Sequence, residues 1–146
     1  MKTTIYGQDE RVVAFVSEKL GEYDFQTTAS AIGVESNGEL IAGVVFDGYT
    51  EAGMNIHVAA LEGRHWLSKE FLYAVFAYPF IQLKCNRVTG LVRADNFKAQ
   101  KLDEHLGFVK EGLIRQGCSD KTDMILYGML KEECRWIHKK ELSYGK

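Results

Sequence analysis

The chain has 146 residues, 46% of them hydrophobic, which suits one ordinary domain with a continuous core. A formal net charge of −2 offers no general attraction to a phosphate backbone, so we expect no nucleic-acid partner. The three cysteines form neither a CxxC pair nor a disulfide framework, and neither a signal peptide nor a membrane-spanning segment is evident. These features predict a single cytoplasmic domain over residues 1–146, monomeric or homodimeric, with no membrane partner.

The first third of the chain is predicted to form a strand, a helix and a hairpin. Residues Met1 to Tyr6 alternate weakly as a strand, and Asp9 is expected to cap the following helix, whose apolar positions recur on one face. Between residues 31 and 46, two β-rich runs flank Asn37 and Gly38, the dipeptide that best tolerates the positive φ angles of a tight turn. This segment is therefore interpreted as a β-hairpin.

The middle of the chain alternates between strand and helix patterns. Residues Gly53 to Ala60 read as a strand with successive side chains on opposite faces. From Ser68 the apolar spacing becomes helical until Pro79, where the helix is expected to end or kink. Residues Arg87 to Arg93 are again strand-like, and they precede a short helix that Gly107 closes.

Two last strands are expected over residues 108–114 and 123–130, followed by a charged tail, 131–146, that is either a docked helix or frayed. This order predicts an α/β (α+β) fold in which helices flank a central mixed sheet. A helix that connects two parallel strands commonly leads to a ligand site at their carboxyl ends. A dinucleotide-binding oxidoreductase is excluded because no GxGxxG motif follows an N-terminal strand.

Several short motifs in the second half of the chain stand in a family order. They are YPF from Tyr78, NRV from Asn86, the spacing from Asn96 to Ala99, LGFVKEGLIR and DMILYGML. Together they resemble the GNAT acetyltransferases, most closely the branch that acetylates the N-termini of ribosomal proteins. The resemblance implies an acyl-CoA N-acyltransferase fold whose mostly antiparallel sheet is splayed between its fourth and fifth strands.

The resemblance also implies an activity, which is the transfer of an acetyl group from acetyl-CoA to a primary amine by direct attack in a ternary complex, with no metal. The acceptor is a peptide N-terminus, a lysine or a small amine, and no motif in the chain distinguishes these. The pantetheine arm of the cofactor is expected to pair with the fourth strand along Val58, Ala59 and Ala60, in the way that an added strand pairs with a sheet edge.

The segment GRHWLS departs from the pyrophosphate loop of the family, which has a Gln or Arg and two small residues before a helix. The glycines of that loop are missing here. The free N–H groups at the start of the helix, with a charge from Arg64, are still expected to contact phosphates. The expected phosphate-binding residues are Arg64, His65, Trp66, Leu67 and Ser68. The alternative is a non-catalytic binding module with this fold.

Acetyl transfer needs a base for the amine, and His57 is the first candidate because imidazole titrates near neutrality. Strand alternation turns its side chain away from that of Val58. A hydrogen-bonded structural histidine is the competing interpretation, with Glu62 or a water chain then acting as base. Asp47 is a weaker option, since it resembles an ordinary strand-end residue.

Transfer also needs a proton for the departing thiolate. The resemblance implies a tyrosine at the position that Asp103 occupies, and a carboxyl could replace it only if burial strongly raised its pKa. The pattern favours a solvated aspartate on the helix surface, which leaves Tyr127 as a substitute donor or as packing. Asn96 is expected to cap its helix, to hydrogen-bond the pantetheine arm, or both.

Overall fold

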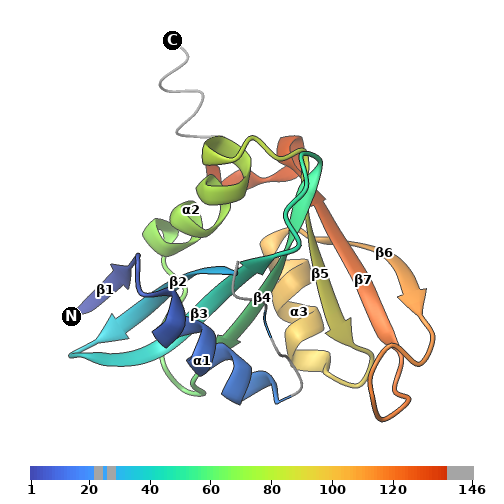
Figure 1. Cartoon of the computed structure of the whole chain (residues 1–146), viewed down its shortest axis with the longest axis horizontal. Coiled ribbons are helices and arrows are strands. Elements are labelled where there is room, and N and C mark those ends of the chain that lie inside the picture. Colours follow the sequence, from blue (N-terminus) through green and yellow to red (C-terminus); the bar gives the residue numbers. More distant parts are fainter. Residues whose placement is uncertain (22–24, 26–28, 138–146) are drawn as a thin grey trace.

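The computed structural model describes residues 1–21, 25 and 29–137, and these build one seven-stranded sheet with helices on both faces (Figure 1). The strand order is β1-β2-β3-β4-β5-β7-β6. The strands are β1 (Lys2–Ile5), β2 (Ser30–Ser36), β3 (Glu39–Asp47), β4 (Gly53–Ala60), β5 (Arg87–Arg93), β6 (Val109–Ile114) and β7 (Met124–Leu130). Among the described pairs only β4 and β5 run parallel, so the expected mixed, mostly antiparallel sheet is confirmed.

The helical segments are α1 (Asp9–Leu20), α2 (Lys69–Ala77), the π-helical turn η1 (Tyr78–Gln82), α3 (Phe97–Leu106) and the short 3-10 turn η2 (Lys131–Glu133). In Figure 1, α1 crosses one face of β2, β3 and β4, while α2 and α3 lie behind the sheet. None of the described helices is long and apolar enough to cross a membrane.

The hairpin between β2 and β3 confirms the strongest local prediction. Asn37 has φ of 54° and Gly38 has φ of 83°. Two successive residues with positive φ are typical of a type I′ turn, whose twist matches that of the flanking strands. The expected role of Asp9 is wrong, because α1 begins after Gln8 without a side-chain cap. Asp9 Oδ1 instead accepts a hydrogen bond from the Ala31 N–H of β2 at 3.1 Å.

Helix α1 lies close to the sheet because two glycines face it. Gly33 and Gly43 are direct register partners on β2 and β3. A β-carbon at Gly43 would lie 2.8 Å from Val12 Cγ1, a distance that no real contact tolerates. The apolar cluster on this side is small and consists of Ile5, Val12, Val16, Ala29, Ala31, Val45 and Ala59.

The larger core lies on the opposite face of the sheet, beneath α2, η1 and α3. Phe76 of α2 stacks with Phe80 and also contacts the ring of Phe108. Pro79 cannot donate the hydrogen bond that would continue α2, and the chain widens into a π-turn in which Leu83 N–H donates to Tyr78 O. The predicted kink at Pro79 is confirmed.

Side-chain caps begin α2 and α3, and the sequence indicated the second of them, at Asn96. Ser68 Oγ accepts from Phe71 N–H, and Gly107, with φ of 110°, ends α3. The first part of the tail is docked, since Ile137 is fully buried and Trp136 Nε1 donates to Leu106 O at 2.8 Å. Residues 138–146 of the tail lie outside the described residues.

Candidate functional site

The candidate site is the place where β4 and β5 separate. Their parallel ladder runs from Gly53 and Arg87 to Ile56 and Gly90 and then stops. Both strands continue beyond this point, β4 to Ala60 and β5 to Arg93. The predicted splay between the fourth and fifth strands is therefore present, and it opens a cleft of about 170 Å³ that α1, β4, β5 and α3 line.

The cleft reaches both faces of the sheet. His57 and Leu91 line it, and by strand alternation their side chains lie on the face that α1 covers. Val58 and Val92 also line it, and their side chains lie on the face of α3. Two reactants could therefore approach the same gap from opposite sides of the sheet.

The edge of β4 carries backbone groups that point into this gap. Leu61 N–H donates to Ile41 O of β3, and antiparallel hydrogen bonds to one neighbour recur at every second residue. His57 and Ala59 therefore direct their N–H and C=O groups toward β3. Val58 and Ala60 direct theirs toward β5, from which β4 has already separated.

His57 is held by a carboxylate on the neighbouring strand. Its Nε2 lies 2.9 Å from Asp47 Oδ1, and only 6% of its side chain is exposed. The edge of the Phe25 ring packs on the imidazole at 4.9 Å between centroids. Asp47 is thus more than the strand-end residue that the sequence suggested, because the β3–β4 register brings it beside His57. An aspartate in this position fixes the orientation of the ring.

Asp103 lines the cleft from α3. It is 9% exposed, so the expectation of a solvated helix-surface residue is wrong. Burial, with a smaller contribution from Glu104, raises the pKa of its carboxyl to about 7. The sequence held a signal for this burial, since Asp103 lies four residues after Ala99 and three before Leu106, on the apolar side of the helix.

Tyr127 is not among the residues that line the cleft. It is fully buried in β7, where its backbone pairs with that of Gly90 in β5. Its hydroxyl donates to Glu104 Oε2 at 2.8 Å. Burial, followed by the negative charges of Glu104 and Asp103, raises the pKa of this phenol well above its usual range. The structure therefore does not bring Tyr127 together with His57.

Arg64 and His65 lie in the loop between β4 and α2, away from the cleft. Arg64 Nη1 donates to Glu39 Oε1 of β3 at 2.9 Å, in an ion pair whose side chains are 36% and 61% exposed, respectively. His65 contributes its backbone carbonyl, which accepts from Lys2 Nζ at 2.6 Å. The only basic side chain proposed for the phosphates thus has a carboxylate partner in this structure.

The second part of this loop is shaped by packing. The Trp66 ring packs edge-on against Phe71 of α2, 6.0 Å between centroids, whereas Leu67 is 40% exposed. Ser68 caps α2 and so uses one of the N–H groups that open the helix. Neither the loop residues nor the cap line the cleft between β4 and β5.

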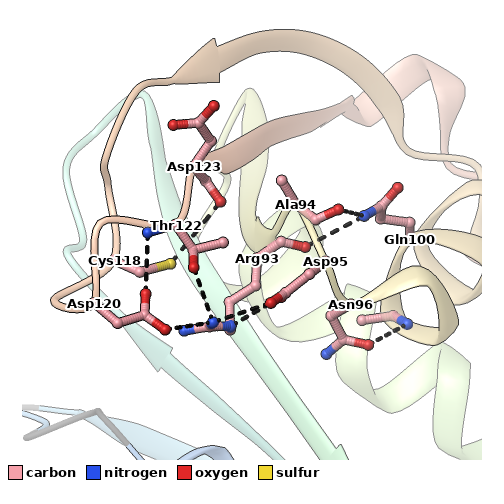
Figure 2. A network of polar contacts seen from close by, with 10 residues as sticks. Arg93, Ala94, Asp95, Asn96, Gln100, Cys118, Asp120, Thr122 and Asp123 are labelled. Atoms are coloured by element: carbon pink, nitrogen blue, oxygen red, sulfur yellow. Dashed lines mark hydrogen bonds and ion pairs between the residues drawn. The ribbon is translucent and has the colours of Figure 1, made fainter.

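Asn96 does line the cleft, and its side chain has the capping role expected of it. Its Oδ1 accepts from Ala99 N–H at 3.1 Å at the start of α3 (Figure 2). In the same view, Gln100 Nε2 donates to Ala94 O at 2.9 Å and holds the turn between β5 and α3. These contacts fix the end of α3 that borders the cleft.

Arg93 is a cleft residue that the sequence did not indicate. Figure 2 shows its guanidinium between Asp95 and Asp120, with ion pairs of 3.0 and 2.8 Å. Its hydrogen bonds hold the pKa of both carboxyls below their usual range. Arg93 also donates to Thr122 Oγ1 and so ties the end of β5 to the loop between β6 and β7.

Glu62, the alternative base, lies on the surface. It accepts from Lys98 Nζ of α3 at 2.9 Å, and this contact lowers the pKa of its carboxyl. It does not line the cleft. Across residues 1–21, 25 and 29–137, no group of three or more histidine, cysteine or acidic side chains is arranged to hold a metal ion.

Known proteins were compared with the chain in sequence and structure. No protein-family model matches. The Bacillus subtilis (strain 168) protein named "Putative ribosomal N-acetyltransferase YdaF" is 28% identical over 109 residues, which are 63% of this chain and 60% of that protein. The chain therefore spans about three fifths of the length of this curated relative.

Solved structures resemble the chain over more of its length. A mutant form of the spermidine/spermine N-acetyltransferase SpeG from Vibrio cholerae superposes with a TM-score of 0.73 at 16% identity, covering 95% of this chain and 99% of that one. A structure described as a probable acetyltransferase gives a TM-score of 0.61 at 22% identity, covering 73% of this chain and 64% of that one. The fold expected from the motifs is thus confirmed.

Proposed function

We propose that this chain, a GNAT-superfamily protein by its fold and its sequence relative, transfers an acetyl group from acetyl-CoA to a primary amine. One observation carries the proposal. The gap between β4 and β5 is open to both faces of the sheet, presents backbone groups of Val58 and Ala60, and has the His57–Asp47 pair on one side. An acyl donor and an amine acceptor can meet in such a gap.

The cofactor is proposed to bind by backbone pairing. A pantetheine arm contains amide groups, and these can pair with the N–H and C=O groups that Val58 and Ala60 direct into the gap. Such pairing depends little on side-chain identity, so it tolerates sequence change. The Val58 N–H is also the proposed donor to the thioester oxygen, on which negative charge develops during attack.

His57 is the proposed base. While Asp47 holds Nε2, the imidazole takes the proton that the amine loses as its new N–C bond forms. Asp47 fixes the ring through its contact with Nε2, so it acts through His57 as a positioning residue. The C–S bond to the donor breaks in the same reaction.

The acceptor is proposed to be a peptide N-terminus, a lysine or a small amine. The B. subtilis relative is named for ribosomal N-acetylation and the V. cholerae protein for spermidine and spermine, and all these acceptors are primary amines or polyamines. We propose that the protein acts in the cytoplasm, because Cys85 and Cys134 are buried free thiols, as a reducing compartment allows.

The proposal is tested first by binding and then by turnover. Acetyl-CoA present at 100 times its Kd should stabilise the fold by about 2.7 kcal/mol, which thermal denaturation detects as a rise in Tm. Incubation with acetyl-CoA and a panel of peptides, lysine derivatives and polyamines should then give a product heavier by one acetyl group in mass spectrometry. A protein that binds no acyl-CoA at millimolar concentration would refute the proposal.

One observation favours a second function, a non-catalytic module built on the same fold. The loop before α2 lacks the family's glycines, and its Arg64 is paired with Glu39. A module of this kind would bind another ligand in place of acetyl-CoA. Calorimetric titration with acetyl-CoA and CoA distinguishes the two, since only the enzyme should release heat with both.

A further inference from the structure

Asp103 is the buried titratable group of the cleft that the mechanism above does not use. It lies on α3, on the opposite face of the sheet from His57, and both residues line the cleft. Among the described residues, no hydrogen bond or ion pair holds its carboxyl. Among these residues no fully buried side-chain oxygen lacks a hydrogen-bond partner, so the Asp103 carboxyl keeps contact with the cleft that it lines, where a ligand can reach it.

The space for this carboxyl is created by Gly90. A β-carbon at Gly90 would lie 3.2 Å from Asp103 Oδ2, so any larger residue there would press on the carboxyl. Gly90 is also the last residue of β5 that pairs with β4, through Ile56. The carboxyl of Asp103 therefore sits where the two strands begin to separate.

The surroundings keep a substantial fraction of the carboxyl neutral near pH 7. Burial is the main cause of its raised pKa of about 7, and the negative charge of Glu104 on the same helix adds to it. Tyr127 of β7 is a nearby titratable group outside the cleft. The other titratable or charged groups that line the cleft are His57, Lys19 and Arg93. A neutral carboxylic acid is a proton donor, which a surface aspartate at pH 7 is not.

Acetyl transfer has a step that needs such a donor. An alkyl thiolate leaves faster when a general acid protonates the sulfur as the C–S bond breaks. We propose that the Asp103 carboxylic acid donates this proton to the departing sulfur, on the opposite side of the gap from the base at His57. This inference rests on the proposed acetyltransferase function.

The protons balance over one turnover. The amine loses a proton to His57 as the N–C bond forms, and the sulfur gains one from Asp103 as the C–S bond breaks. His57 then releases its proton and Asp103 takes one up from solvent, which restores the starting state. Tyr127 has no part in this scheme, because its hydroxyl is directed to Glu104.

The test compares two acetyl donors that differ in how much their sulfur needs a proton. Asp103→Asn should lower kcat with the alkyl thioester S-acetyl-N-acetylcysteamine by about 10²-fold, because an amide cannot donate a proton to sulfur. With the aryl thioester S-acetylthiophenol, whose thiolate leaves unprotonated, the loss should be only a few-fold. Asp103→Ser is a second variant with the same expected contrast, should the asparagine variant not fold.

Glu104→Gln is the matched control, since it changes the adjacent carboxylate on the same helix. At a pH below the pKa of Asp103, where its carboxyl is protonated in both proteins, this variant should keep the wild-type ratio of rates on the two donors. The pH profile adds a second readout. Wild-type kcat on the alkyl thioester should decline as pH rises through the pKa of Asp103, and this decline should shift to lower pH in Glu104→Gln and disappear in Asp103→Asn.

The outcomes separate this inference from the proposed function. Wild-type protein that acetylates no amine with either donor or with acetyl-CoA would overturn the proposed function and the role of Asp103 with it. Two results with active wild-type protein would overturn the role of Asp103 alone. One is that its variants lose kcat by the same factor on both thioesters. The other is that kcat of the variants still declines as pH rises, as in the wild type.

Discussion

The cleft between β4 and β5 and the loop from Arg64 to Ser68 are both candidate cofactor-binding regions, and they differ in what they offer a ligand. The cleft presents backbone groups of β4 together with the buried side chains of His57 and Asp103. In the loop only His65 and Leu67 are exposed, and its arginine is paired with Glu39. A ligand site that relies on strand separation survives changes in sequence, whereas one that relies on a glycine-rich loop does not.

If the chemistry belongs to the cleft, the largest effect should come from His57. His57→Gln should lower kcat by about 10² to 10⁴-fold, because glutamine keeps a polar side chain but cannot accept the amine proton. Asp47→Asn should have a smaller effect in the same direction, since it leaves the base in place. Steady-state kinetics across the pH range in which imidazole titrates provide the measurement. A wild-type kcat in His57→Gln would show that another group acts as the base.

Burial of Asp103 makes a prediction about stability that does not depend on turnover. The folded state binds this proton more tightly than the unfolded chain, whose carboxyl has an ordinary pKa, so stability should fall as pH rises from about 4 to about 7. The contribution is on the order of 4 kcal/mol at most, from about 1.4 kcal/mol for each unit of pKa. Urea denaturation of Asp103→Asn should show a flatter dependence on pH and greater stability than wild type at pH 8.

Asn96 borders the cleft and allows its structural role to be separated from ligand binding. Asn96→Ala should cost about 1 kcal/mol of stability through loss of the cap on α3. Asn96→Asp keeps the cap acceptor but removes the amide donor, so it should fold normally and bind acetyl-CoA several-fold more weakly. Calorimetric titration of Asn96→Asp with acetyl-CoA distinguishes the two roles. Unchanged affinity would show that Asn96 acts only as a helix cap.

The loop should show the smallest effects. Arg64→Ala removes an exposed ion pair with Glu39, which is worth about 0.2 to 1 kcal/mol, so stability should change little. If the guanidinium exchanges Glu39 for a cofactor phosphate, Arg64→Ala should weaken the binding of CoA more than the binding of a pantetheine fragment that lacks the pyrophosphate. Glu39→Gln is the paired variant, and it should then strengthen CoA binding by releasing Arg64. Equal losses of affinity for CoA and for the pantetheine fragment would show that Arg64 affects binding only through the folded structure.

Features set by neighbouring residues could be predicted from the sequence. The Asn37–Gly38 turn, the cap at Asn96 and the break at Pro79 each depend on the φ angles or hydrogen-bonding groups of a few adjacent residues. The strand from Gly53 to Ala60 was likewise predicted with its observed bounds, because alternation is a local pattern. Asp9 was misread because its carboxylate binds the backbone of β2, which lies far along the chain.

The sequence by itself determined the elements, their order and, through the ordered motifs, the fold. Tertiary structure alone decided which side chains share the cleft. The β3–β4 register joined Asp47 to His57, the docking of α3 buried Asp103 over Gly90, and the same packing turned Tyr127 toward Glu104. Strand register and helix docking depend on contacts between residues distant in sequence, and the burial that raises the pKa of Asp103 exists only once those contacts have formed.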